Sequence, residues 1–226
     1  MGLLTPKRVV EEELLDEENA PAVDVDRSLR DLRRINRYLG GSGIYRRMIR
    51  RLAPRSRPLT ILDVGTGTSD LLDSLPDAMI SIRIGLDFKI DHLIFGRRVN
   101  RHRIAGVVGD ASHLPFRSGS IDVVTSSHFF HHFEVEENVG ILTEACRVAR
   151  VGVAVNDTRR HLVPLMMVLT LSALRLVGRI TRFDAPASVR RGYTIEEARS
   201  VTQRVPAGRR ATVRLFPWRF GLLLWK

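Results

Sequence analysis

The sequence has very little cysteine and lysine and no long apolar run. Its single cysteine, Cys146, excludes an intramolecular disulfide and any cysteine-rich metal site. Lysine occurs only at positions 7, 89 and 226, so arginine carries almost all of the positive charge. The most apolar segment, residues 162–174, is too short for a transmembrane helix. The N-terminus turns acidic where a secretory signal would be apolar, which predicts a cytoplasmic protein.

What the chain does have is an ordinary apolar fraction of 44% and a net charge of +11. A length of 226 residues fits one domain with a sizeable core. A strongly basic chain suggests nucleic acid or an anionic membrane surface as a partner. An arginine bias spread over solvated surfaces explains the same charge, and the sequence leaves these interpretations open. It does not indicate an oligomeric state.

Short apolar runs alternate with helical patterns from residue 58 onward, which predicts a parallel sheet with helices on both faces. The expected strands are 59–64, 82–87, 104–108, 121–126 and 151–155, and the expected helices are 69–75, 90–99 and 135–149. Two further runs, 211–216 and 220–225, are typical of a closing antiparallel pair. The predicted fold class is therefore α/β.

Three segments outside this alternation are harder to interpret. Residues 1–24 are acidic and predict a loosely packed arm, after which Asp26 is expected to cap a helix from Arg27, followed by a helix over 44–52. Residues 162–174 form a cap over the active site, a core helix or a membrane-contacting surface. Residues 183–194 resemble a loop, and Thr194 with Glu197 makes a capping box for the helix that follows.

Acidic and glycine residues follow the expected strands at their carboxyl ends, where ligands bind in an open parallel sheet. Gly65 and Gly67 allow a tight turn and a close backbone approach. Asp87 ends the next strand, where a carboxylate accepts ribose hydroxyls. Asp63 and Asp70 flank the glycine loop; they would repel a pyrophosphate but attract a sulfonium and an ammonium. The implied ligand is S-adenosylmethionine in preference to NAD.

Four stretches in this order resemble the class I S-adenosylmethionine-dependent methyltransferases, in the small-molecule branch related to the ubiquinone and menaquinone methyltransferases. They are Leu62-Asp-Val-Gly-Thr-Gly-Thr-Ser69, Gly85-Leu-Asp87, Gly109-Asp-Ala111 with Leu114-Pro-Phe116, and Ser120 to His132. The resemblance implies a Rossmann-like, doubly wound, seven-stranded sheet with an antiparallel last strand, N-terminal helices and a helical cap insertion. This sequence differs from the family pattern at Ser69, where a third glycine is usual.

The resemblance also implies roles for the cofactor-binding residues. Gly65 and Gly67 would border the methionine part of the cofactor, Asp87 would hold the ribose, and Asp110 and Ala111 would meet the adenine; Asp63 belongs to the same set. Residues 1–57 would form an acidic arm and helices that cover the site. Residues 58–226 would form the methyltransferase domain, a single globular unit together with 27–57.

Three histidines follow the fourth expected strand. Histidine titrates near neutrality and serves as a general base, so His128 and then His132 are the catalytic candidates, with pocket lining as the alternative. His131 matches a position that in the family is often structural. No acidic or cysteine ligand stands beside the three histidines in the sequence, so no metal site is expected.

Substrate-binding candidates follow the fifth strand and the expected loop. Asn156, Asp157 and Arg159 should face the crevice, where they would orient a hydroxyl or pair with an anion, although helix capping explains the first two equally well. Arg190 and Tyr193 are candidates for reaching the substrate cavity; the alternative is a solvated loop.

The leading functional prediction is methyl transfer from S-adenosylmethionine to a small hydrophobic, phenolic or polyketide-like acceptor, on oxygen in preference to carbon. An RNA methyltransferase is a second hypothesis, suggested by charge alone. It is disfavoured because Ser126-Ser-His-Phe129 replaces the motif of base-amine methyltransferases. A non-catalytic protein that binds S-adenosylmethionine is the third. A small-molecule acceptor is thus expected as partner, nucleic acid is not, and peripheral contact with a membrane stays open.

Overall fold

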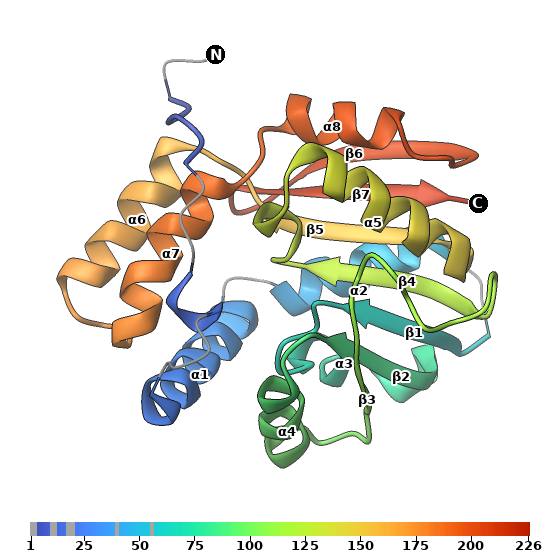
Figure 1. Cartoon of the computed structure of the whole chain (residues 1–226), viewed down its shortest axis with the longest axis horizontal. Coiled ribbons are helices and arrows are strands. Elements are labelled where there is room, and N and C mark those ends of the chain that lie inside the picture. The colour runs from blue at the N-terminus through green and yellow to red at the C-terminus, as the bar shows by residue number, and fades with distance from the viewer. Residues whose placement is uncertain (1–3, 10–12, 17–20, 39–40, 55–56) are drawn as a thin grey trace.

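The sheet at the centre of the molecule is built as the sequence predicts. A computed structural model describes the chain apart from residues 1–3, 10–12, 17–20, 39–40 and 55–56. The seven described strands lie in the order β3-β2-β1-β4-β5-β7-β6 (Figure 1). They are β1 (Leu59–Val64), β2 (Ile80–Asp87), β3 (Ala105–Val108), β4 (Ile121–Ser127), β5 (Ala149–Thr158), β6 (Arg209–Leu215) and β7 (Arg219–Trp225). The first five pair in parallel, and β7 runs antiparallel to β5 and β6, which confirms the expected Rossmann-like topology.

Helices cover both faces of this sheet. They are α1 (Ala22–Tyr38), α2 (Gly41–Leu52), α3 (Asp70–Asp73), α4 (Ile90–Val99), α5 (Val135–Val148), α6 (Leu162–Ala173), α7 (Arg179–Arg191) and α8 (Ile195–Gln203), with the 3₁₀ turns η1 (Leu14–Asp16), η2 (Asp77–Met79) and η3 (Phe130–His132). Side chains of α5 and α8 form one buried cluster with the sheet, and those of α2 and α3 form another. Apolar strands are thus covered on both sides, as parallel sheets require.

Strand boundaries run longer than predicted where a neighbour supplies pairing. β5 was expected over 151–155, yet it continues to Thr158 because β7 pairs with it from Gly152 to Thr158. β2 likewise begins at Ile80, which pairs with Leu59 of β1. The first crossover helix is only four residues long, so the linker after β1 is as short as the sequence indicates.

The expected start of the first helix is wrong. α1 begins at Ala22, so Asp26 lies inside the helix, where it is 3.7 Å from Arg30 one turn later. The helix starts early because the carbonyl of Pro21 accepts hydrogen bonds from the backbone N–H groups of Asp24 and Val25. The N-cap role predicted for Asp26 is therefore corrected to a side-chain pair on the helix surface.

Residues 183–194 were expected to be a loop, but most of them belong to α7. Pro186 lies inside this helix and has no N–H for the carbonyl four residues earlier. That carbonyl, Arg182 O, instead accepts a hydrogen bond from the Ser172 hydroxyl at 3.2 Å, from the end of α6. A tertiary contact thus replaces the lost helical bond. The capping box of Thr194 and Glu197 forms as predicted.

The helices α6 and α7 form a cap beside the carboxyl ends of the parallel strands, with α1 packed against α7 (Figure 1). The described parts of the N-terminal arm are packed, in contrast to the loose arm expected. The backbone N–H groups of Leu14 and Leu15 donate to the Asp184 carboxylate on α7 at 2.8 and 3.1 Å. Arg8 binds Glu134 at 2.6 Å, which ties the arm to the start of α5.

Among the described residues, no helix combines the length and apolarity needed to cross a bilayer. The most apolar helix, α6, has twelve residues. Its proline, Pro164, lies in the first turn, where a missing N–H costs nothing, as predicted.

Candidate active site

The glycine loop after β1 turns through left-handed backbone conformations. Gly65 and Gly67 have φ of +65° and +52°, which glycine adopts without steric cost. A Cβ at Gly65 would lie 2.2 Å from the Phe129 ring, whereas a Cβ at Gly67 would meet open space. Ser69, where the family usually has a third glycine, also has a positive φ of 56°, and its hydroxyl lies 3.1 Å from the Thr66 hydroxyl. The loop thus exposes backbone at Gly67 and is closed by an aromatic ring at Gly65.

Asp63 lies beneath this loop. Its buried carboxylate accepts hydrogen bonds from the hydroxyls of Tyr45, Thr66 and Thr125 at 3.1, 3.0 and 2.7 Å. Burial raises the pKa of Asp63 to about 6, although the three hydroxyls act in the opposite direction. Asp63, one of the predicted cofactor residues, therefore holds the glycine loop in place through its hydrogen bond with Thr66.

Asp87 joins the glycine loop to the end of β2. One carboxylate oxygen accepts from the backbone N–H of Gly67 at 2.7 Å and the other from that of Lys89 at 2.9 Å. Burial opposes its charge, but His92 and these two N–H groups lower the pKa of Asp87 below the ordinary value. The next side chain, Phe88, is 79% exposed. Sequence reasoning missed Phe88, although a large apolar residue after a binding carboxylate is a usable signal.

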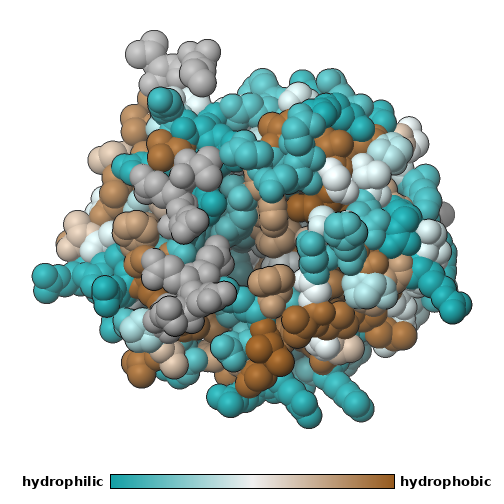
Figure 2. Space-filling model, viewed as in Figure 1, coloured by the Kyte–Doolittle hydropathy of each residue, from teal (hydrophilic) through white to brown (hydrophobic). Residues whose placement is uncertain are grey.

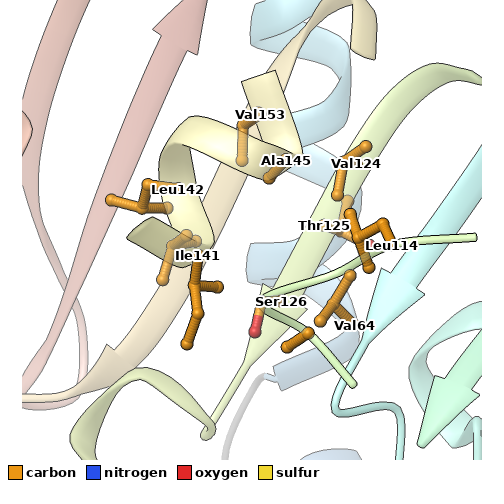
Figure 3. A pocket seen from close by; sticks show the side chains of 11 residues that line it. Val64, Leu114, Val124, Thr125, Ser126, Ile141, Leu142, Ala145 and Val153 are labelled. Atoms are coloured by element: carbon orange, nitrogen blue, oxygen red, sulfur yellow. The ribbon is translucent and has the colours of Figure 1, made fainter. Parts of the chain in front are cut away.

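The ends of β1 and β4 and the turn after β3 meet around one small cavity of about 10 Å³ (Figure 3). Val64, Ala111 and Ser126 line it together with apolar side chains of α5. Its volume is about that of a single water site, so it does not itself hold a cofactor. Ala111 is buried there, whereas Asp110 is exposed and binds the backbone N–H and hydroxyl of Ser112.

His128 follows β4 directly and has a positive φ of 53°, a sparsely populated conformation that concentrates at functional sites. Its Nδ1 is 3.2 Å from the Thr158 hydroxyl, and its Nε2 is buried without a hydrogen-bond partner. Burial, together with the positive charge of Arg219, lowers the pKa of His128 to about 3. The imidazole is therefore neutral at physiological pH.

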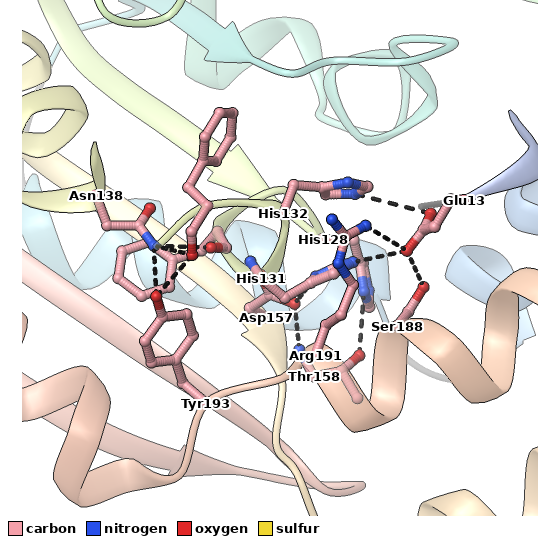
Figure 4. A network of polar contacts seen from close by, with 12 residues as sticks. Glu13, His128, His131, His132, Asn138, Asp157, Thr158, Ser188, Arg191 and Tyr193 are labelled. Atoms are coloured by element: carbon pink, nitrogen blue, oxygen red, sulfur yellow. Dashed lines mark hydrogen bonds and ion pairs between the residues drawn. The ribbon is translucent and has the colours of Figure 1, made fainter. Parts of the chain in front are cut away.

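His131 lies between two carboxylates (Figure 4). Its Nδ1 is 2.8 Å from Asp157 and its Nε2 is 3.5 Å from Glu13 of the arm. Burial opposes the charge of His131, but both carboxylates raise its pKa to about 10. The same contacts outweigh burial and lower the pKa of Glu13 and of Asp157 to about 2. His132 lies at the edge of this group, 3.8 Å from Glu13. No local pattern marks Glu13, which reaches the histidines only through the fold.

The carboxyl ends of β4 and β5 carry a group of buried polar atoms that have no hydrogen-bond partner within the described part of the chain. They are Ser126 Oγ, Ser127 Oγ, His128 Nε2, and Oδ1 and Nδ2 of Asn156. Few buried polar atoms in native proteins lack partners, and a bound ligand is one thing that satisfies them. Asp157, by contrast, has both oxygens engaged by His131.

The remaining substrate candidates lie in separate places. Tyr193 is buried, and its hydroxyl donates to Phe133 O at 2.7 Å and accepts from Asn138. Arg159 lines a surface hollow of about 530 Å³ between the arm and the start of α8. Arg190 is half-buried near the end of α7. The fold thus brings Asn156 and Asp157 to the histidines and directs Tyr193 into the core.

Comparisons with known proteins agree with this geometry. The family described as "Methyltransferase domain" matches residues 62–155. The demethylmenaquinone methyltransferase of Roseiflexus sp. (strain RS-1) is 35% identical over 99 residues, which are 42% of this chain and 40% of that protein. The chain thus spans about two fifths of the length of the curated relatives that it matches.

Two solved structures share the fold. The first is a SAM-dependent methyltransferase from Aquifex aeolicus, with a TM-score of 0.63 at 16% identity, covering 88% of this chain and 97% of that one. The second is a plantazolicin methyltransferase in complex with SAH, with a TM-score of 0.69 at 12% identity, covering 94% and 92%. At these identities the structures support the fold alone. Residues 62–155 thus match a methyltransferase domain family and resemble part of the demethylmenaquinone methyltransferases, and the chain as a whole has the fold of solved SAM-dependent methyltransferases.

Proposed function

We propose that this protein binds S-adenosylmethionine and transfers its methyl group to a small hydrophobic acceptor, on an ionisable oxygen in preference to carbon. The observation that carries the proposal is the hydrogen bond from the Gly67 N–H to Asp87, which fixes a left-handed glycine loop beside an ionised carboxylate at the carboxyl edge of the sheet. This loop and carboxylate lie within the matched methyltransferase domain.

The residues present fit the cofactor. A carboxylate oxygen has room for more than one donor, so Asp87 can bind ribose hydroxyls while it holds the loop. The open space at Gly67 suits the close approach of the methionine part. The exposed ring of Phe88 would cover one face of the adenine, and Asp110 and Ala111 would meet its edge.

When bound, the cofactor supplies an activated methyl group for an in-line displacement, so the protein's main task is to position the acceptor. The unpartnered atoms of Asn156 and His128 are available to bind and orient an acceptor hydroxyl. Because His128 is neutral, its Nε2 can accept the hydroxyl proton in the tautomer that carries hydrogen on Nδ1, with Thr158 fixing the ring. With so low a pKa His128 is a weak base, so it suits an acceptor oxygen that reaches the site ionised or close to ionised, which the ring would then orient.

The cap supports a hydrophobic acceptor. Several apolar side chains of α6 are exposed. Hydrophobic atoms are visible among polar ones at the left of Figure 2, where Figure 1 shows α6. The exposed apolar side chains are Leu162, Val163, Met166, Met167 and Leu169, and Leu174 and Leu176 follow the helix. Arg175 and Arg179 stand beside them. The same surface suits the peripheral membrane contact that the sequence leaves open.

The proposal is tested by incubating the protein with methyl-labelled S-adenosylmethionine and a panel of demethylated quinols, phenols and polyketides, with RNA as a separate arm. We expect label in a small phenolic or quinol product. His128→Asn is the matched variant, since asparagine tolerates the left-handed backbone, and should lower kcat by about 10²–10⁴-fold with cofactor affinity unchanged. Label in RNA alone would support the alternative hypothesis that the protein is an RNA methyltransferase. Binding of S-adenosylmethionine without methyl transfer to any acceptor would support the hypothesis of a non-catalytic binding protein.

A further inference from the structure

Glu13, His131 and His132 bring three metal-ligating side chains to one point beside the carboxyl end of β4. Their ligand atoms all lie within 4.8 Å of one another. The Glu13 carboxylate is 3.5 Å from His131 Nε2 and 3.8 Å from His132 Nε2. Two ligands that each lie about 2.0–2.1 Å from a tetrahedral ion are about 3.4 Å apart, so His131 Nε2 and Glu13 Oε1 already have the separation of a zinc site, and the His132 ring would have to move closer to Glu13.

His131 is already oriented as a metal ligand would be. Asp157, fully buried, binds its Nδ1 at 2.8 Å and its backbone N–H at 2.9 Å, which directs Nε2 toward Glu13 (Figure 4). A carboxylate on the far nitrogen of a ligating histidine is the usual outer-shell arrangement, because it fixes the ring and increases its basicity. Among the described residues the buried Nε2 atom has no hydrogen-bond partner closer than the Glu13 carboxylate, which is 3.5 Å away.

The rest of the surroundings is compatible with a cation. The Ser188 hydroxyl donates to Glu13 at 2.6 Å and so holds the carboxylate in place. Arg191 lies 3.9 Å from one Glu13 oxygen and cannot be a ligand. The two buried carboxylates, Glu13 and Asp157, outweigh the single positive charge of Arg191, so these three side chains carry a net charge of −1 toward a divalent ion. The ion would take the position of the proton between His131 and Glu13.

We propose that Glu13, His131 and His132 form a binding site for one Zn²⁺ or a similar divalent transition-metal ion, with Asp157 as the outer-shell partner of His131. One carboxylate and two imidazoles are ligands typical of zinc, and three protein ligands leave a fourth position for water or an acceptor oxygen. No metal site was expected from the histidines alone, because the acidic ligand comes from the N-terminal arm and does not stand beside them in the sequence. The site depends only on the geometry of these side chains and does not require methyl transfer.

The test uses the full chain, freed of metal with a chelator and then titrated with Zn²⁺ against a chromophoric competitor. We expect one tightly bound ion per chain, and Co²⁺ in its place should give the intense visible absorption of a tetrahedral site. Asp157→Asn should weaken Zn²⁺ binding about 10–100-fold, and Glu13→Gln and His132→Ala should each weaken it further. Thermal unfolding verifies that each variant is folded.

His102→Ala is the matched control, because His102 also pairs with a carboxylate, Asp73 at 2.9 Å, away from the proposed site. It should bind Zn²⁺ like the wild type. Absence of a stoichiometric ion in the wild type, or wild-type affinity in both Glu13→Gln and His132→Ala, would overturn the proposal. His131 would then be an imidazolium held between two carboxylates.

Discussion

At the scale of single residues, the ring of Phe129 determines what position 65 tolerates. Gly65→Ala introduces a Cβ 2.2 Å from this ring, whereas Gly67→Ala meets no atom within 4 Å. Both variants also place alanine at a positive φ, which costs about 1–2 kcal/mol. We expect Gly65→Ala to lose about 1–3 kcal/mol more unfolding free energy than Gly67→Ala, because of overpacking. Urea unfolding without ligand measures both losses, and equal losses would show that Phe129 moves away freely.

Asp63 predicts a pH dependence of stability. Its folded pKa of about 6 lies above its ordinary value near 4, so the folded state binds a proton more tightly than the unfolded state. The stabilisation is complete below pH 4 and is lost as the pH rises through 6. Relative to Asp63→Asn, the wild type should therefore lose about 1–2 kcal/mol between pH 5 and 7.5, as measured by urea unfolding. A relative gain over that range would contradict the buried position of this carboxylate.

Local sequence patterns predicted the glycine loop and Asp87, since both depend on strand ends that the sequence marks. They did not predict Glu13, whose partners are brought to it by the fold. The same holds for Tyr193, which looked exposed beside two arginines yet lies in the core under Arg8.

At the scale of elements, α7 shows how a tertiary contact overrides a local signal. Ser172 provides the hydrogen bond that Pro186 cannot, so Ser172→Ala should cost about 1 kcal/mol of unfolding free energy. Thr170→Ala is the control, because its hydroxyl binds the carbonyl of its own helix at Met166 and is exposed. In a Pro186→Ala background the restored N–H binds Arg182 O, so the cost of Ser172→Ala should shrink. An undiminished cost in that double mutant would mean that the two groups are not coupled.

Strand positions and the starts of α4, α5 and α8 were predictable from bounded apolar runs and capping residues, whereas the start of α1 was not. α1 begins five residues before the expected site because Pro21 O accepts the first backbone bonds. Such bonds depend on backbone geometry and leave no signature in side-chain type.

At the scale of the whole molecule, the exposed face of the cap and the net positive charge act together. We expect the protein to cosediment with anionic lipid vesicles more than with neutral ones, and this binding to fall with salt, since arginines beside exposed apolar side chains favour such a surface. Met166→Asp should weaken the binding, and Val99→Asp on α4, also at an exposed apolar position, should not. Equal binding by both variants would mean that the cap does not contact lipid.

The most direct test of the account is calorimetric titration of the full chain with S-adenosylmethionine, in the wild type and in Asp87→Ala. The account predicts saturable binding at one site, weakened by about 1–3 kcal/mol in the variant, because a buried hydrogen-bonding carboxylate is lost. NAD should not bind. Unchanged affinity in Asp87→Ala, or no binding of S-adenosylmethionine to the wild type, would contradict the assignment of the glycine loop and Asp87 as the cofactor site.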